Sequence, residues 1–248
     1  MVNGKSPCLW TNDLHGVVKK LLVGFLIFVV IIFVTIIPKS RRRINLEYIQ
    51  EHEIVSYLRN GDIICRLGDR PWSLLFREIS PNDKRFSHLG IVRISGGIIS
   101  VINAEGLAVE GRGYVNEVSL KEFLKIAQSV GIYRLNGIDG IDGNEISDAA
   151  LEFKGYPFDW QFDMNENTKL YCSELLYVVL KKISPNIELN CIWLKEIGKY
   201  IIPVDVCSQS EYFVEIGFWG KNSKAGKAHN VPAAARSDQR VKIHYPAP

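Results

Sequence analysis

The sequence has no CxxC pair, no internal repeat and no strong excess of charge of one sign. Because CxxC spacing is absent, a zinc-ribbon site is not expected, and we predict neither a metal site nor another cofactor. An odd number of cysteines argues against a full disulfide framework, so at least one thiol is expected to be free. The net charge of +3 gives no indication of a nucleic-acid partner. The five cysteines are scattered along the chain, at positions 8, 65, 172, 191 and 207.

With 248 residues, of which 47% are hydrophobic and 23% charged, the chain is long enough for one sizeable domain with appendages. Its most prominent feature is an uncharged hydrophobic run, LLVGFLIFVVIIFVTII, at residues 21–37. As a helix this run would be about 26 Å long, close to the roughly 30 Å core of a bilayer. No small-residue cleavage site follows it, so an uncleaved single-span anchor is favoured over a signal peptide or a buried core helix.

Three regions are therefore expected. Residues 1–43 form an N-terminal segment with the anchor, residues 44–220 form the folded domain, and residues 221–248 form a polar tail without periodicity, expected to be disordered. The predicted location is a bacterial cell membrane, spanned once. Lysines and arginines near the span favour a cytoplasmic C-terminal domain by only one charge, so the orientation stays open.

The folded region alternates between strand and helix patterns, which indicates an α+β domain. Short apolar strands are predicted after the turn at 60–62 and at 129–135. Helical spacing is found at residues 71–80, 119–127, 145–155 and 171–183. Ser119 and Glu122 have the spacing of a capping box at the start of the second of these helices.

A β-hairpin is predicted in RFSHLGIVRISGGIISVINAEG, residues 85–106. Gly96 and Gly97 suit a two-residue turn in which both residues have positive φ. Counting outward from this turn places His88 directly opposite Glu105, so both side chains should lie on one face within hydrogen-bond reach. A carboxylate on one ring nitrogen would orient the imidazole and leave the other nitrogen as a base. A structural His–Glu pair, or a register shifted by one residue, would remove this interpretation.

A cysteine lies at the start of the last predicted helix, in the sequence LYCSELLY. The amides of a helix N-terminus favour a thiolate and can stabilise an oxyanion, so Cys172 is expected to be the most reactive cysteine. A buried structural cysteine is the alternative. Together with His88 and Glu105, Cys172 completes the parts of a thiol nucleophile system. The rival interpretations are a metal site built from the same three residues and a binding scaffold with a vestigial site.

The order of these residues and their local sequences resemble the YiiX/YebB-like hydrolases, circularly permuted relatives of papain in the NlpC-type superfamily. The resemblance covers most of residues 60–185 and depends chiefly on SHLGIV at 87–92, AEG at 104–106 and YCSELL at 171–176. It implies a permuted papain-like domain with a small antiparallel, barrel-like sheet and packed helices. It also implies that Cys172 is the nucleophile, His88 the general base and Glu105 the residue that orients the histidine.

The function predicted from sequence is a membrane-anchored thiol hydrolase that cleaves an amide, ester or thioester bond. Peptide, cell-wall and lipid-type acyl substrates all remain open, as does acyl transfer to an acceptor other than water. The binding-scaffold alternative also remains open. The membrane is the other expected partner, and family members are often exported, which opposes the small charge difference across the span.

Overall fold

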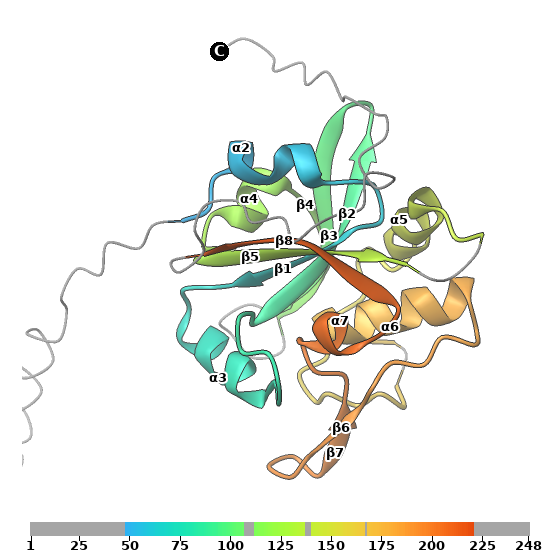
Figure 1. Cartoon of the computed structure of the whole chain (residues 1–248). Helices are drawn as coiled ribbons and strands as arrows, with labels where there is room; N and C mark the ends of the chain where they lie inside the picture. The colour runs from blue at the N-terminus through green and yellow to red at the C-terminus, as the bar shows by residue number, and fades with distance from the viewer. Residues whose placement is uncertain (1–47, 107–111, 137–139, 167, 221–248) are drawn as a thin grey trace, which may run out of the picture. The chain divides into compact units, whose positions relative to one another are not determined.

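The computed structural model describes residues 48–106, 112–136, 140–166 and 168–220 (Figure 1). The predicted anchor at 21–37 and the predicted disordered tail at 221–248 lie outside these residues. No helix within the described ranges is long and apolar enough to cross a membrane.

The domain is built on one antiparallel sheet of six strands, in the order β4-β3-β2-β1-β5-β8. These strands are β1 (Ile63–Leu67), β2 (His88–Ser95), β3 (Ile98–Gly106), β4 (Gly113–Ser119), β5 (Ser129–Leu135) and β8 (Phe213–Gly220). A separate hairpin pairs β6 (Ile192–Leu194) with β7 (Lys199–Ile201). The helices are α2 (Glu51–Ile54), a 3-10 turn at Val55–Tyr57, α3 (Pro71–Ile79), α4 (Leu120–Leu124), α5 (Gly143–Leu151), α6 (Cys172–Ile183) and α7 (Val206–Gln209).

The sheet buries both of its faces, as alternation along β1 demonstrates. Ile63 and Cys65 belong to the core shared with α5 and α6. Ile64 points the other way, into a second core that includes residues of α2 and α4. Figure 1 shows α2 and α4 above the central strands β5 and β1, with α6 and α7 below them. The domain therefore has three layers, and the α+β class predicted from sequence is confirmed.

The central hairpin has the turn that the sequence predicts. Gly96 and Gly97 have φ values of 59° and 82°, which residues with a side chain rarely adopt. The register also follows the prediction over the printed ladder, in which Ser95 pairs with Ile98 and Ile91 with Ile102. This register determines which side chains of β2 and β3 share a face.

A local capping signal accounts for the start of α4. The Ser119 hydroxyl accepts a hydrogen bond from the Glu122 amide at 3.1 Å, as expected for the cap of α4. Helix α6 begins at Cys172 and runs to Ile183, as the sequence predicts. Strands β4, β6, β7 and β8 were not predicted. Two of them, β4 and β8, form the edges of the main sheet.

Candidate active site

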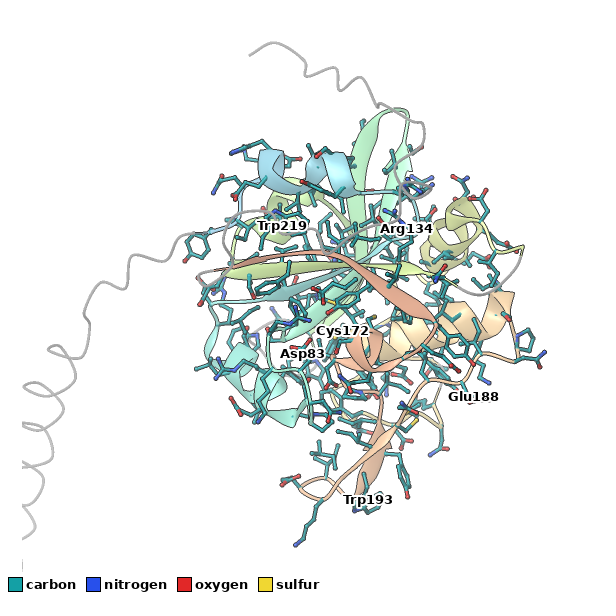
Figure 2. All side chains as sticks on the ribbon, in the orientation of Figure 1. Asp83, Arg134, Cys172, Glu188, Trp193 and Trp219 are labelled. Carbon is teal, nitrogen blue, oxygen red and sulfur yellow. The ribbon has the colours of Figure 1, made fainter. Side chains whose placement is uncertain are left out.

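The residues singled out from sequence meet at one end of the main sheet. His88 is the first residue of β2, Glu105 is the penultimate residue of β3, and Cys172 is the first residue of α6. All three line one cavity of about 610 Å³. Figure 2 shows Cys172 near the middle of the domain, below the strands of the sheet. The structure therefore brings the three sequence-predicted side chains to a common space.

The hydrogen-bond partner of His88 differs from the expected one. Nε2 of His88 lies 2.9 Å from Oδ1 of Asn103, whereas Glu105 makes no hydrogen bond or ion pair with the ring. Asn103 is two residues before Glu105 on β3, on the same strand face. Since a carboxamide oxygen only accepts, Nε2 carries the proton and the lone pair of the imidazole is on Nδ1. The prediction of a contact between His88 and Glu105 was wrong. The side-chain amide of Asn103 contacts the ring instead.

A glycine makes room for this amide. Continuing the β2–β3 ladder by one residue places Gly90 beside Asn103. A Cβ atom at Gly90 would lie 2.5 Å from Cγ1 of Val101 and 3.0 Å from Cβ of Asn103. Any side chain at Gly90 would therefore push against Asn103, which is buried and holds His88.

Glu105 is bound by an arginine that the sequence did not single out. Nη2 of Arg66 lies 2.5 Å from Oε1 of Glu105, and Nη1 donates to the carbonyl oxygen of Phe123 at 2.5 Å. The guanidinium also lies 4.3 Å above the Phe123 ring. Arg66 is directly opposite His88 in the β1–β2 ladder, so it reaches past the histidine to the carboxylate. No motif in the sequence indicates this contact, because it depends on the register of β1 against β2.

The surroundings of His88 favour its neutral form. Burial lowers its pKa most, and the positive charge of Arg66 lowers it further. The charge of Glu105 and the hydrogen bond to Asn103 oppose these effects, and the resulting pKa is about 4. Near neutral pH the imidazole is therefore an unprotonated base.

The thiol of Cys172 is also neutral, contrary to the expectation from its position at a helix start. Burial raises its pKa. Hydrogen bonds from the backbone of Leu89 and Ser173 lower the pKa but do not outweigh the burial. The contact with Leu89 places the sulfur beside the residue that directly follows His88. The prediction of an ionised thiol at the start of α6 was wrong, because the side chain is only 9% exposed.

The residues on either side of Cys172 hold one wall of the cavity. The hydroxyl of Tyr171 accepts a hydrogen bond from the Ile202 amide at 2.8 Å. The hydroxyl of Ser173 donates to the Ile202 carbonyl oxygen at 2.7 Å. Both backbone groups of Ile202 are thus bound to the first turn of α6, which fixes the distance between this wall and the sulfur.

Two further acidic residues lie outside the cavity. Asp62 is buried at the opposite end of β1, where both of its oxygens accept hydrogen bonds from Arg134 at 2.7 Å. Glu174 is buried in the first turn of α6, and burial raises its pKa to about 8. Its carboxyl group is therefore mostly protonated at neutral pH, and it accepts a hydrogen bond from the Tyr171 amide at 3.3 Å.

The side chains that could bind a metal ion are not clustered in the part of the chain that the structure describes. Within those residues there is no group of three or more His, Cys, Asp or Glu side chains placed to hold an ion. His88 and Glu105 already have Asn103 and Arg66 as partners. The arrangement instead places a thiol, an imidazole and a carboxylate around one cavity.

Comparisons with known proteins agree with this fold. Residues 57–197 match the model of a family described as permuted papain-like amidase enzymes, YaeF/YiiX, C92 family. Among solved structures, the chain is similar to the metalloprotein yiiX from Escherichia coli O157:H7, with a TM-score of 0.56 and 16% identity. The match covers 66% of this chain and 98% of that protein. No curated protein matches the sequence.

Proposed function

The chain belongs to the YaeF/YiiX family of permuted papain-like amidases and is thus a cysteine hydrolase, and we propose that it cleaves amides with Cys172 as nucleophile and His88 as base. The observation that carries this assignment is the contact of 2.9 Å between His88 and Asn103 on the cavity that Cys172 also lines. It leaves Nδ1 of a neutral imidazole free to accept the thiol proton.

Attack and proton transfer are coupled in this proposal, because both groups start neutral. Nδ1 of His88 takes the thiol proton while the sulfur of Cys172 bonds to the carbonyl carbon and the carbonyl electrons move to oxygen. The imidazolium then returns the proton to the amide nitrogen as the C–N bond breaks. An amine leaves, and the acyl group remains on sulfur as a thioester.

Water completes the cycle. His88 removes a proton from water as its oxygen bonds to the thioester carbon, the C–S bond breaks, and a carboxylic acid and the free thiol result. The amides in the first turn of α6 are the donors for the negative oxygen in both steps, because the Cys172 and Ser173 amides have no acceptor within the helix. Asn103 holds the ring through its hydrogen bond, and the carboxylate of Glu105 stabilises the transient imidazolium by its charge.

The hydrophobic run at residues 21–37 supports a second part of the proposal, which concerns the location of the protein. Its length and lack of charge support a single-span anchor in a bacterial cell membrane. Extraction of membranes with alkaline carbonate should leave the full-length protein in the pellet. A variant with three leucines of the run changed to arginine should appear in the supernatant. Release of the unchanged protein by carbonate would overturn the anchor.

The catalytic assignment is tested by trapping the acyl-enzyme. With an N-acyl aminocoumarin amide, intact-protein mass spectrometry should detect one acyl group, and peptide mapping should locate it on Cys172. Cys172→Ala and His88→Ala should each abolish coumarin release. The matched control is Cys191→Ala, since Cys191 is an exposed cysteine outside the cavity and its loss should leave the rate unchanged. Acylation of another residue, or full activity of Cys172→Ala, would contradict the proposal.

A further inference from the structure

One buried acidic side chain close to the nucleophile has no part in the chemistry proposed so far. Glu174 is the third residue of α6, two positions after Cys172, and it is 1% exposed. Its Oε2 accepts a hydrogen bond from the Tyr171 amide at 3.3 Å. Its Oε1 is buried and has no hydrogen-bond partner among the described residues. The carboxyl group is thus held by a single donor, on one of its two oxygens.

An ionised carboxylate would be poorly stabilised in this position. Burying a charge costs much free energy unless hydrogen-bond donors or a cation compensate for the lost water. Asp159, which is 2% exposed, has such compensation, because its oxygens accept from the Gln161 and Asp163 amides at 2.8 and 2.5 Å. Glu174 has only one long contact instead. The surroundings of Glu174 therefore favour a protonated carboxyl group.

The charges that face Glu174 act in the same direction. Burial raises its pKa most, the Tyr171 amide lowers it, and Asp159 and Asp163, on the chain before α6, raise it further, to about 8. The nearest cation is used elsewhere, since Nζ of Lys199 at the start of β7 lies 3.0 Å from Oδ2 of Asp163. No lysine or arginine within the described ranges contributes to the pKa of Glu174.

The charge state of Glu174 matters because the first turn of α6 also serves the reaction. The Cys172 and Ser173 amides have no acceptor within the helix and are the proposed donors to the substrate oxygen. A negative carboxylate at the next residue would oppose the negative charge that develops on this oxygen, because both lie at the same helix end. Burial also raises the pKa of Tyr171 and of Cys172, so a protonated Glu174 leaves this turn without any negative side chain.

Glu174 also supports the residue directly before the nucleophile. The Tyr171 amide donates to Glu174, and the Tyr171 hydroxyl accepts from the Ile202 amide at 2.8 Å. The carboxyl group therefore caps the backbone that carries the Cys172 sulfur. A glutamine has the same shape and keeps an acceptor oxygen, so Glu174→Gln removes the ionisation without removing the cap.

We propose that Glu174 is a positioning residue that works as an uncharged acid, and that its ionisation weakens the first turn of α6 as an oxyanion site. The inference rests on the proposed thiol amidase activity and adds a residue to it. As the pH rises, the carboxyl proton of Glu174 passes to solvent, and no bond of the substrate is involved. Glu174 thus sets an alkaline limit on the activity, whereas His88 sets the acid limit.

Rates with an N-acyl aminocoumarin amide from pH 6 to 10 test this role. In the unchanged enzyme, kcat/KM should fall about tenfold between pH 7 and pH 9. Glu174→Gln should have a similar rate at pH 7 and should keep it up to pH 9. The matched control is Glu166→Gln, which removes a half-exposed carboxylate that pairs with Lys169 before α6 and should leave the fall unchanged. An alkaline limb that persists in Glu174→Gln would overturn the inference.

Infrared spectroscopy without substrate separates a failure of this inference from a failure of the proposed catalysis. The difference spectrum between the unchanged full-length protein and Glu174→Gln at pH 6.5 should contain the C=O stretch of a protonated carboxylic acid. The band should be lost at pH 9.5, and the corresponding spectrum for Glu166→Gln should not contain it at either pH. Absence of the band at pH 6.5 would overturn the inference, even in an enzyme that is shown to be a thiol amidase.

Thermal stability provides a second measurement that needs no activity. The pKa of Glu174 in the folded protein lies above the usual 4.5, so this group adds stability at low pH that is lost as the pH rises through about 8. The melting temperature of Glu174→Gln, relative to that of the unchanged protein, should therefore increase from pH 5 to pH 8 and then level off. Glu166→Gln should show no such trend. A constant difference between Glu174→Gln and the unchanged protein would contradict a buried, uncharged acid.

Discussion

The imidazole of His88 is held by the amide oxygen of Asn103 at 2.9 Å, and both residues belong to one β-hairpin. This contact determines which ring nitrogen carries the proton. It requires no residue from outside the hairpin, so the orientation of the base is a property of the β2–β3 register.

Replacement of Asn103 tests this relationship. Asn103→Ala should lower kcat up to about 100-fold through misorientation of the ring, with little change in KM. Asn103→Asp should keep the acceptor but add a negative charge, which raises the pKa of His88. The acid limb of the pH–rate profile should then move to higher pH in Asn103→Asp only. A rise in KM together with the fall in kcat, with reduced thermal stability, would instead indicate a purely structural amide.

The pH dependence of the enzyme follows from the surroundings of His88. The base works only when unprotonated, so activity should persist as the pH falls and be lost near the pKa of about 4. The rate measured from pH 3 to 8, with protein stability followed in parallel, checks this. An acid limb near pH 6.5, the usual pKa of histidine, would contradict the described burial and charge.

Substitutions of Arg66 and of Glu105 should shift the acid limb of the pH–rate profile in opposite directions. The charge of Arg66 lowers the pKa of His88, so Arg66→Met should move the limb to higher pH. The charge of Glu105 raises that pKa, so Glu105→Gln should move the limb to lower pH. The pair distinguishes a role through charge from the hydrogen-bonded role that the sequence suggested for Glu105, because loss of an orienting contact would lower kcat at every pH.

Alkylation should reveal a protonated thiol. Because burial raises the pKa of Cys172, the rate of its reaction with iodoacetamide should rise about tenfold per pH unit from pH 6 to 9, without a plateau. Among the cysteines that the structure describes, Cys191 is the exposed one, and the Cys191→Ser variant removes it from the measurement. A rate that is already constant below pH 7 would mean that the thiolate forms in the free enzyme.

Stability depends on a different ion pair, at the far end of β1. Asp62 is 1% exposed and receives two hydrogen bonds from Arg134. Asp62→Ala leaves the guanidinium without its carboxylate partner, with only the Tyr57 carbonyl oxygen still accepting from it, and should lower the free energy of unfolding by about 3–5 kcal/mol. The exposed Asp148 is the control, and Asp148→Ala should cost less than about 1 kcal/mol. Denaturant titrations measure both, and kcat/KM per folded molecule should stay unchanged.

The sequence predicted the parts of the site whose contacts are local. The Gly96–Gly97 turn specifies its own register, and the start of α6 follows from a short pattern around Cys172. The contact between Arg66 and Glu105 could not be read in this way, because it joins β1 to β3 across β2. The pKa of Cys172 was mispredicted for the same reason, since burial depends on the whole domain while a helix start is visible locally.

The order of the chain has a consequence for biosynthesis. The hairpin that carries His88 and Asn103 leaves the ribosome well before Cys172, and β8, which completes the sheet, is the last described strand to appear. During translation His88 and Asn103 are therefore made before Cys172. Under the proposed mechanism, a chain that ends before Cys172 lacks the nucleophile, so hydrolysis would begin only after α6 has been made and has packed on the sheet.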